Sequence, residues 1–189
     1  MSVQEQPRRR QTRKAKEPAD GHDAAPSRRD LQRGLELHFF AHLNLAEDAN
    51  RQLAALDMGR THHRILYFTV QTPGITVGEL TSLLRVTHQA IQRPMGDLVR
   101  GGYIQQQMSS VDRRQRQLFS TPKGLALFEQ LSQRQFERLA RAYEKAGSEA
   151  VMGFWAVLSA MVEPADHEWI RRGEQARAAP AAGHAKKAK

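Results

Sequence analysis

The segment from residue 73 to residue 124 constrains the fold more than any other part of the chain. Behind a Pro-Gly turn and a short β-branched run, residues 79–84 carry leucines at the spacing of one face of a short helix. After a turn at residues 85–86, Thr87 is a good N-cap for a second helix. The residues of this second helix that can pack inward are Ile91, Met95 and Leu98. Gly101-Gly102 ends the helix, as a left-handed C-terminal cap would.

Two strands are predicted to follow these helices. Residues 103–108 and 115–121 have the composition of short strands, and residues 109–114 form a polar, arginine-bearing loop between them. Two helices joined by a tight turn and followed by a β-hairpin make a helix-turn-helix with a wing. The second helix of such a unit fits the major groove of DNA, which makes double-stranded DNA the first partner to consider.

The charge distribution agrees with this interpretation. The chain of 189 residues has a net charge of +9, and residues 60–123 hold nine Lys/Arg against three Asp/Glu. The flanking segments 30–59 and 124–170 are both net negative. Positive charge therefore coincides with the helix-turn-helix and wing, as a module that follows phosphates requires. The ends of the chain are also basic, and there solubility or nonspecific adhesion is the simpler explanation.

This arrangement resembles the MarR family of bacterial transcription regulators. The resemblance rests on VGELTSLLRVTHQAI, LVRGGYI and DRRQRQLFSTPKG, in which Asp112-x-Arg114 and Thr121-Pro-Lys-Gly fit the family's wing signature. Flanking helices extend it over roughly residues 30–170. The resemblance implies a mainly α fold with a small β-wing (α+β): a winged helix-turn-helix with an intertwined helical dimerisation domain. It also implies a homodimer whose second helices enter major grooves and whose wings reach minor grooves.

The predicted domain organisation has four parts. These are a disordered basic tail (1–29), a helical dimerisation region (30–59 and 124–172), the winged helix-turn-helix (60–123) and a disordered Ala/Lys-rich tail (173–189).

Long amphipathic helices are predicted on both sides of the winged unit. Residues 30–58 have more apolar surface than a monomer's surface helix needs. A helix at 60–71 packs under the helix-turn-helix, and a helix at 122–146 begins at Pro122. A further apolar helix over 151–162 ends near Pro164 or resumes to Arg172. The stripe expected to face inward on the 122–146 helix is Leu125, Phe128, Leu131, Gln135, Leu139 and Ala142. The residues assigned to dimerisation are Leu35, Phe39, Leu43, Leu131, Leu139, Phe154 and Leu158.

Two groups of side chains are candidates for DNA contact. Those on the second helix are Thr87, His88, Gln89, Gln92 and Arg93. Those in the wing are Asp112, Arg113, Arg114 and Arg116. Gln reads adenine edges and Arg reads guanine edges, whereas water or phosphate contact is the alternative for each. By the family resemblance, Arg114, oriented by Asp112, enters a minor groove; the alternative is a solvated turn with an arginine–aspartate pair.

Pro94 departs from the expected pattern because it lies inside the second helix. There it removes a hydrogen-bond donor and costs about 3 kcal/mol relative to Ala. Apolar spacing continues in register past it, so we expect a helix kinked near Ala90 rather than one that stops at Arg93. Base contacts are not expected beyond Arg93.

The family resemblance also implies a small aromatic or amphiphilic effector that releases DNA. The candidate lining residues are Phe39, His42, His63, Tyr67 and Trp155, although all five can equally be core. His38 and His42 stand four residues apart and could share a metal, but hydrogen-bonded interface residues explain them more simply. We therefore expect no metal and no cofactor.

Three classes of function compete at this stage. The first is a sequence-specific homodimeric repressor on a palindromic operator, and the second an architectural or nonspecific DNA-binding protein that uses the wing and basic tails. The third, a metal-dependent enzyme, lacks a recognisable catalytic motif, so no enzymatic activity is expected. The lack of cysteine fits a cytoplasmic, nucleoid-associated protein, and no membrane partner is expected because the apolar stretch at 151–162 is too short to cross a bilayer.

Overall fold

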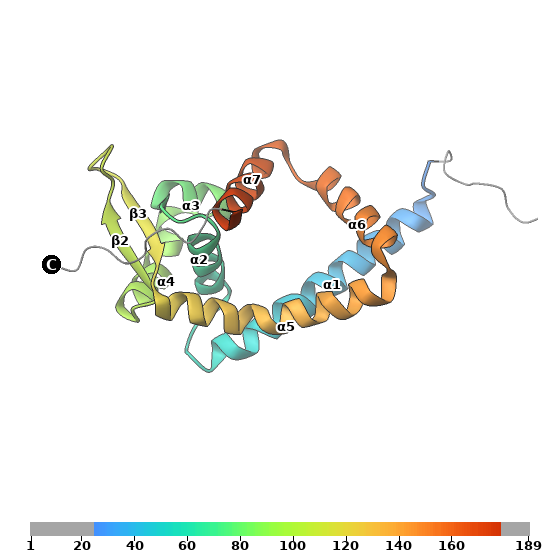
Figure 1. Ribbon diagram of the computed structural model, residues 1–189, viewed down its shortest axis with the longest axis horizontal. Helices are drawn as coiled ribbons and strands as arrows, with labels where there is room; N and C mark the ends of the chain where they lie inside the picture. Colours follow the sequence, from blue (N-terminus) through green and yellow to red (C-terminus); the bar gives the residue numbers. More distant parts are fainter. Residues whose placement is uncertain (1–24, 179–189) are drawn as a thin grey trace, which may run out of the picture. The chain divides into compact units, whose positions relative to one another are not determined.

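The computed structural model describes residues 25–178, so the predicted tails lie mostly outside the described part of the chain. Its elements are α1 (Arg28–Ala54), α2 (Arg60–Gln71), β1 (Ile75–Thr76), α3 (Val77–Leu84), α4 (His88–Arg100), β2 (Ile104–Met108), β3 (Arg116–Ser120), α5 (Pro122–Ala146), α6 (Ser148–Met161) and α7 (Pro164–Ala178) (Figure 1). The chain divides into two compact units, 1–39 and 40–189, and α1 crosses the boundary. The fold is mainly α with a small sheet, as predicted.

The sheet has three antiparallel strands in the order β1-β3-β2. Strands β2 and β3 form the predicted hairpin, with Ile104 opposite Ser120 and Met108 opposite Arg116. The β-branched run before α3 supplies the additional strand β1, and its Ile75 pairs with Leu118. This strand joins the wing to the start of the helix-turn-helix, because α3 begins at the next residue.

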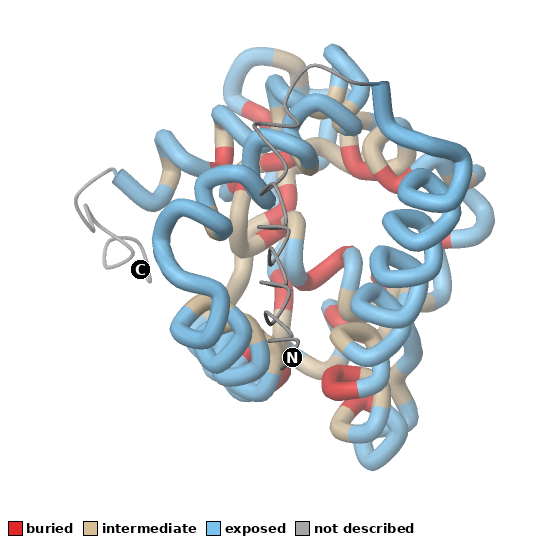
Figure 2. The backbone as a smooth tube through the Cα atoms, turned by 90° about the vertical axis from the view of Figure 1, so that its right-hand side faces the viewer, coloured by how far each residue is buried: buried red, intermediate tan, exposed pale blue. Residues whose placement is uncertain are grey.

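The hydrophobic core lies mainly in the winged unit. Side chains from α2, α3, α4 and all three strands are fully buried there, and the first turns of α5 close the core. The fully buried large side chains are Leu53, Ile65, Leu66, Ile75, Leu80, Ile91, Leu98, Ile104, Leu118 and Leu131. Figure 2 shows these buried stretches in red, whereas long helical stretches are pale blue. Helix α4 is thus fixed in place by packing against the core of the winged unit.

Helix α5 buries the middle of the predicted stripe, where Phe128 and Leu131 belong to the core. Leu125 was expected in this stripe but is 43% exposed, whereas Leu127, which was not part of the stripe, is buried. The reason is Gly124, whose missing side chain lets the helix lie directly against the carbonyl of Tyr103. That contact sets the rotation of the helix. Leu131, which the sequence analysis placed both in this stripe and in the dimerisation set, is fully buried in the chain's own core.

A buried carboxylate joins α1 to α5 within the second unit. Asp48 is 5% exposed, and its two carboxylate oxygens accept hydrogen bonds from Nε (2.7 Å) and a terminal nitrogen (3.1 Å) of Arg138. Gln135 adds a bond of 2.8 Å from its Nε2 to the carbonyl oxygen of Leu45. The two long helices are therefore connected by polar contacts as well as by apolar packing.

Several helix ends differ from the predicted ones. Helix α1 begins at Arg28 and ends at Ala54, because the chain turns at Asp57, which has a left-handed φ of 56°. Helix α7 starts at Pro164 and continues to Ala178, past the boundary drawn at residue 172. Over residues 25–178, no helix is both long and apolar enough to cross a membrane.

Candidate nucleic-acid interface

Helix α4 separates a buried face from a fully exposed one. The side chain of Thr87 caps the helix by accepting a hydrogen bond from the backbone nitrogen of Ala90 at 3.3 Å. The predicted inward residues Ile91, Met95 and Leu98 are buried. The side chains predicted to read DNA are all exposed: Thr87, His88, Gln89, Gln92 and Arg93. Of these, Thr87 also has a structural role, because its hydroxyl caps the N-terminus of the helix.

Pro94 does not end helix α4. The helix is continuous from His88 to Arg100, with Pro94 half-buried in its interior. The proline leaves the carbonyl oxygen of Ala90 without its usual helical donor. Buried Met95 and Leu98 keep the inward register beyond this point, so the helix does not stop at Arg93.

The wing loop is built by two side chains that bind its backbone. The hydroxyl of Ser109 accepts hydrogen bonds from the backbone nitrogens of Val111 (3.2 Å) and Asp112 (3.3 Å). The carboxylate of Asp112 accepts one from the backbone nitrogen of Arg114 at 3.0 Å. Asp112 thus orients Arg114 through its backbone. No ion pair within residues 25–178 involves the guanidinium of Arg113 or Arg114, and both are exposed.

A groove of about 990 Å³ lies between the start of α4, the wing and the start of α3. It brings His88 and Gln92 of α4 together with Arg114 and Arg116 of the wing. The other predicted DNA-contacting residues do not line it: Thr87, Gln89, Arg93, Asp112 and Arg113. The groove also contains residues that the sequence analysis did not select, namely Thr76, Glu79, Gln106, Gln115, Gln117 and Arg172.

Glu79 is the anionic member of the groove. It belongs to a capping box at the start of α3, in which its carboxylate accepts from the backbone nitrogen of Thr76 at 2.8 Å. Arg172 donates to its other oxygen at 2.9 Å. Burial alone raises the pKa of Glu79, but the hydrogen bonds from Thr76 and Arg172 outweigh it and hold the pKa below its usual value. The carboxylate is therefore charged at neutral pH and fully engaged by protein groups.

The Thr-Pro-Lys-Gly segment after the wing has a structural role. The hydroxyl of Thr121 accepts from the backbone nitrogen of Gly124 (3.0 Å) and donates to the carbonyl oxygen of Gly102 (2.6 Å). Lys123 donates to the carbonyl oxygen of Gly101 at 2.8 Å and lies over the ring of Tyr103. These bonds attach the start of α5 to the turn that follows α4.

The five residues predicted to line an effector pocket lie in several different surroundings. Tyr67 lines a cavity of about 630 Å³ whose other walls include Trp169 and Ile170 of α7. Trp155 donates instead to the hydroxyl of Tyr143 at 3.1 Å, and His42 is exposed. Phe39 belongs to the other compact unit.

The remaining member of that set, His63, is half-buried. Its buried Nε2 has no hydrogen-bond partner among residues 25–178, and burial lowers the pKa of the imidazole. Neighbouring His62 has a role that the sequence did not indicate: its Nδ1 accepts from the backbone nitrogen of Gly59 (3.0 Å), and its Nε2 contacts Asp97 of α4 (3.2 Å). Within residues 25–178, no three His, Cys, Asp or Glu side chains cluster as a metal site would require.

Comparison with known proteins identifies the family. Residues 56–115 match the MarR family. The HTH-type transcriptional regulator PetP of Rhodobacter capsulatus is 41% identical over 135 residues, which cover 71% of this chain and 81% of PetP. The solved transcriptional regulator SlyA shares the fold with a TM-score of 0.57 at 17% identity, over 74% of this chain and 96% of SlyA.

A mutant of MarR from E. coli, solved in complex with operator DNA, has a TM-score of 0.53 at 22% identity, over 68% of this chain and 92% of that chain. The extent of the PetP match, together with the winged fold, leads to one assignment. The chain belongs to the MarR family and is a transcription regulator rather than an enzyme.

Proposed function

We propose that this regulator binds specific sequences of double-stranded DNA, with α4 in the major groove and the wing in a neighbouring minor groove. The observation that carries the proposal is the groove between them. Its lining combines two base-reading side chains on α4, His88 and Gln92, with two cations on the wing, Arg114 and Arg116. The MarR mutant with the same fold binds operator DNA, which supports the same use of the fold here.

The chemistry of these side chains fits the proposed positions. Gln92 offers the donor–acceptor pair that matches an adenine edge, and exposed Arg93 offers the fork that matches guanine. Arg114 stands at the turn of the wing with its guanidinium outside any ion pair among residues 25–178. A charge presented in this way suits a narrow minor groove, whose negative potential attracts arginine.

We further propose that the protein acts as a homodimer. Apolar side chains on α1 and α6 are exposed in the single chain, including Leu35 (69%), Leu43 (48%) and Phe154 (44%). Within the second unit, an apolar cavity of about 440 Å³ between α1, α5 and α6 is lined by Leu139, Ala142, Val151 and Phe154. A second copy that covered this surface would remove it from water. In this proposal, residues 30–59 and 124–172 form the dimerisation region, and residues 60–123 form the DNA-binding domain.

Two-fold symmetry of the dimer sets the form of the operator. Each recognition helix would read one half of a palindrome, with half-sites about one helical turn apart. We propose that binding occludes a promoter, so that the protein is a cytoplasmic repressor associated with the nucleoid. A small aromatic or amphiphilic effector would release it by preferring a spacing of the two recognition helices that does not fit DNA.

The alternative is an architectural or nonspecific DNA-binding protein. The basic ends of the chain favour it, since their positive charge can attract phosphates of any sequence. Most of those residues lie outside the described part of the chain. The alternative differs from the proposal in one measurable property, the preference for a sequence.

Selection from a pool of random duplexes at roughly physiological salt tests the proposal directly. Recovery of a two-fold symmetric site supports the dimeric regulator. Arg114→Ala should then weaken binding to all sequences, whereas Gln92→Ala should relax one position in each half-site by about 1–3 kcal/mol. Recovery of no consensus, together with binding that disappears when residues 1–29 and 171–189 are removed, would support the nonspecific alternative.

A further inference from the structure

Helix α7 contacts both ends of α3, the first helix of the helix-turn-helix. At the start of α3, Arg172 donates to Glu79 at 2.9 Å. At its end, Arg85 donates to Asp166 of α7 at 2.6 Å. Figure 1 shows α7 beside α2 and α3. The last described helix thus contacts the DNA-binding unit, although the sequence analysis had assigned its residues up to 172 to dimerisation.

The contact with α2 is close. Gly173 is buried, and a side chain added there would meet the backbone oxygen of Gln71 at 3.7 Å. Arg177 donates to the side-chain oxygen of Gln71, and Trp169 packs against the hydrophobic core. These contacts pack α7 against α2 and the hydrophobic core.

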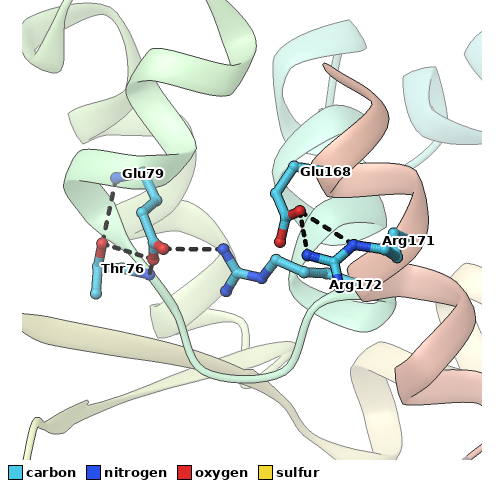
Figure 3. A network of polar contacts seen from close by, with 5 residues as sticks. All are labelled: Thr76, Glu79, Glu168, Arg171 and Arg172. Atoms are coloured by element: carbon cyan, nitrogen blue, oxygen red, sulfur yellow. Dashed lines mark hydrogen bonds and ion pairs between the residues drawn. The ribbon is translucent and has the colours of Figure 1, made fainter. Parts of the chain in front are cut away.

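Arg172 is held on two sides. Its guanidinium lies 4.5 Å from the ring centre of Trp169 on the same helix. On the other side it reaches the carboxylate of Glu79, whose second oxygen is engaged by Thr76 (Figure 3). Because Glu79 and Arg172 both line the groove between recognition helix and wing, this ion pair joins α7 to one wall of the proposed DNA site.

The neighbouring Arg171 provides an internal comparison. It pairs with Glu168 one turn earlier on the same helix, and both side chains are more than half exposed. Figure 3 shows the two arginines on one helix, Arg172 bonded to Glu79 and Arg171 bonded to Glu168. The two residues have the same charge, but only the ion pair of Arg172 joins two elements.

We infer that Arg172 is a positioning residue for operator recognition, through which α7 sets the orientation of the helix-turn-helix relative to the rest of the subunit. The Arg85–Asp166 pair holds the opposite end of α3 in the same way. This inference rests on the proposed function, because it concerns the accuracy with which α4 is presented to DNA. It assigns α7 a role distinct from dimerisation.

The test compares binding of the full-length protein to two duplexes of equal length. One is recovered by selection with the wild-type protein, and the other is its scrambled sequence. Exposed and partly exposed ion pairs contribute modestly, so Arg172→Ala should weaken binding to the selected duplex about two- to fivefold. Its affinity for the scrambled duplex and its salt dependence should stay unchanged. Arg171→Ala, the matched control, should have no effect on either duplex.

A double-mutant cycle shows whether Arg172 acts through Glu79. Glu79→Gln keeps the capping box and removes the charge, since either side chain can accept at this position. The double variant should bind the selected duplex no more weakly than Arg172→Ala alone. Arg172→Lys, which keeps the charge on a more flexible stem, should fall between wild type and alanine. At the other end of α3, reversal of both charges in Arg85→Asp/Asp166→Arg should restore affinity that Asp166→Arg alone loses.

The outcomes that overturn the inference are distinct. Equal weakening on both duplexes, with a salt slope reduced by about one, would make Arg172 a direct phosphate contact. Identical binding of Arg172→Ala and wild type would remove any role in recognition. Failure of the wild type to prefer the selected duplex would refute the proposed function instead. In that case amide hydrogen exchange decides the inference: Arg172→Ala, but not Arg171→Ala, must accelerate exchange in α3 for it to stand.

Discussion

Gly124 lies so close to Tyr103 that an ideal Cβ on the glycine would be 1.9 Å from the tyrosine's carbonyl oxygen. The start of α5 therefore packs directly on the backbone that links α4 to β2. Thr121 and Lys123 bond to the adjacent carbonyl groups of Gly102 and Gly101. Together these contacts connect the recognition helix, the wing and the long helix α5 at one point.

Gly124→Ala should strongly destabilise the protein, because either Tyr103 or the first turn of α5 must shift. The change can be measured as a lower midpoint of thermal unfolding. Gly78→Ala is the matched control, since nothing lies within 4 Å of a side chain added there. Alanine is favoured over glycine in helices by roughly 1 kcal/mol, so the control should be neutral or more stable. Equal behaviour of the two variants would contradict the close packing at Gly124.

Pro94→Ala should stabilise the protein. The substitution returns a backbone N–H that can donate to the carbonyl oxygen of Ala90, and proline costs up to about 3 kcal/mol in a helix interior. Because the helix is already continuous through Pro94, the new residue needs no rearrangement. Urea unfolding at neutral pH measures the gain. A less stable variant would indicate that the proline ring contributes packing that exceeds the cost of the missing bond.

Asp48→Asn should make stability less dependent on acid pH. The hydrogen bond from Arg138 holds the pKa of Asp48 below its usual value, although burial opposes this effect. A carboxylate whose pKa is lowered by folding contributes stability above its unfolded pKa, about 3.9, and that contribution is lost as pH falls through the folded pKa. The wild type should therefore lose more stability than the variant between pH 6 and pH 3, as measured by thermal unfolding.

Glu47→Gln serves as the control for Asp48. Glu47 pairs with Arg51 at 3.7 Å, and both side chains are more than half exposed. Exposed pairs of this kind contribute little, so the control should follow the wild-type pH profile. If Asp48→Asn also follows that profile, the buried pair does not contribute to acid stability.

His63→Leu should remove a loss of stability in mildly acidic solution. Burial lowers the pKa of His63 in the folded protein, so below the unfolded pKa of about 6.5 the unfolded chain takes up a proton that the folded chain does not. Folding is therefore disfavoured as pH falls from about 6.5 through the lower folded pKa. Leucine also removes the unpartnered Nε2, which should keep or raise stability at pH 7.

Exposed His88 is the comparison for that experiment. Thermal unfolding at pH 7 and pH 5 should give His88→Ala the pH dependence of the wild type and His63→Leu a weaker one. A wild-type pH dependence in His63→Leu would show that the imidazole is hydrated or paired in solution.

The features that could be predicted from sequence depend on residues close together in the chain. Helices α2 and α5 have the predicted bounds, 60–71 and 122–146, because glycine or proline marks their ends and an apolar period fills the interior. Thr87 caps α4, and Ile91, Met95 and Leu98 face the core, for the same reason. Hydrogen bonds and packing within one or two helical turns leave a periodic signal that is readable without the fold.

Other features were decided only by tertiary structure. The pairs Arg172–Glu79 and Arg85–Asp166 join residues 93 and 81 positions apart, and no local pattern indicates either one. The rotation of α5, which exposes Leu125 and buries Leu127, follows from the approach of Gly124 to Tyr103. An amphipathic period tells which residues can share a face, but the element packed against a helix decides which face is buried. The sequence thus determined the winged helix-turn-helix, whereas tertiary packing determined that α7 contacts it.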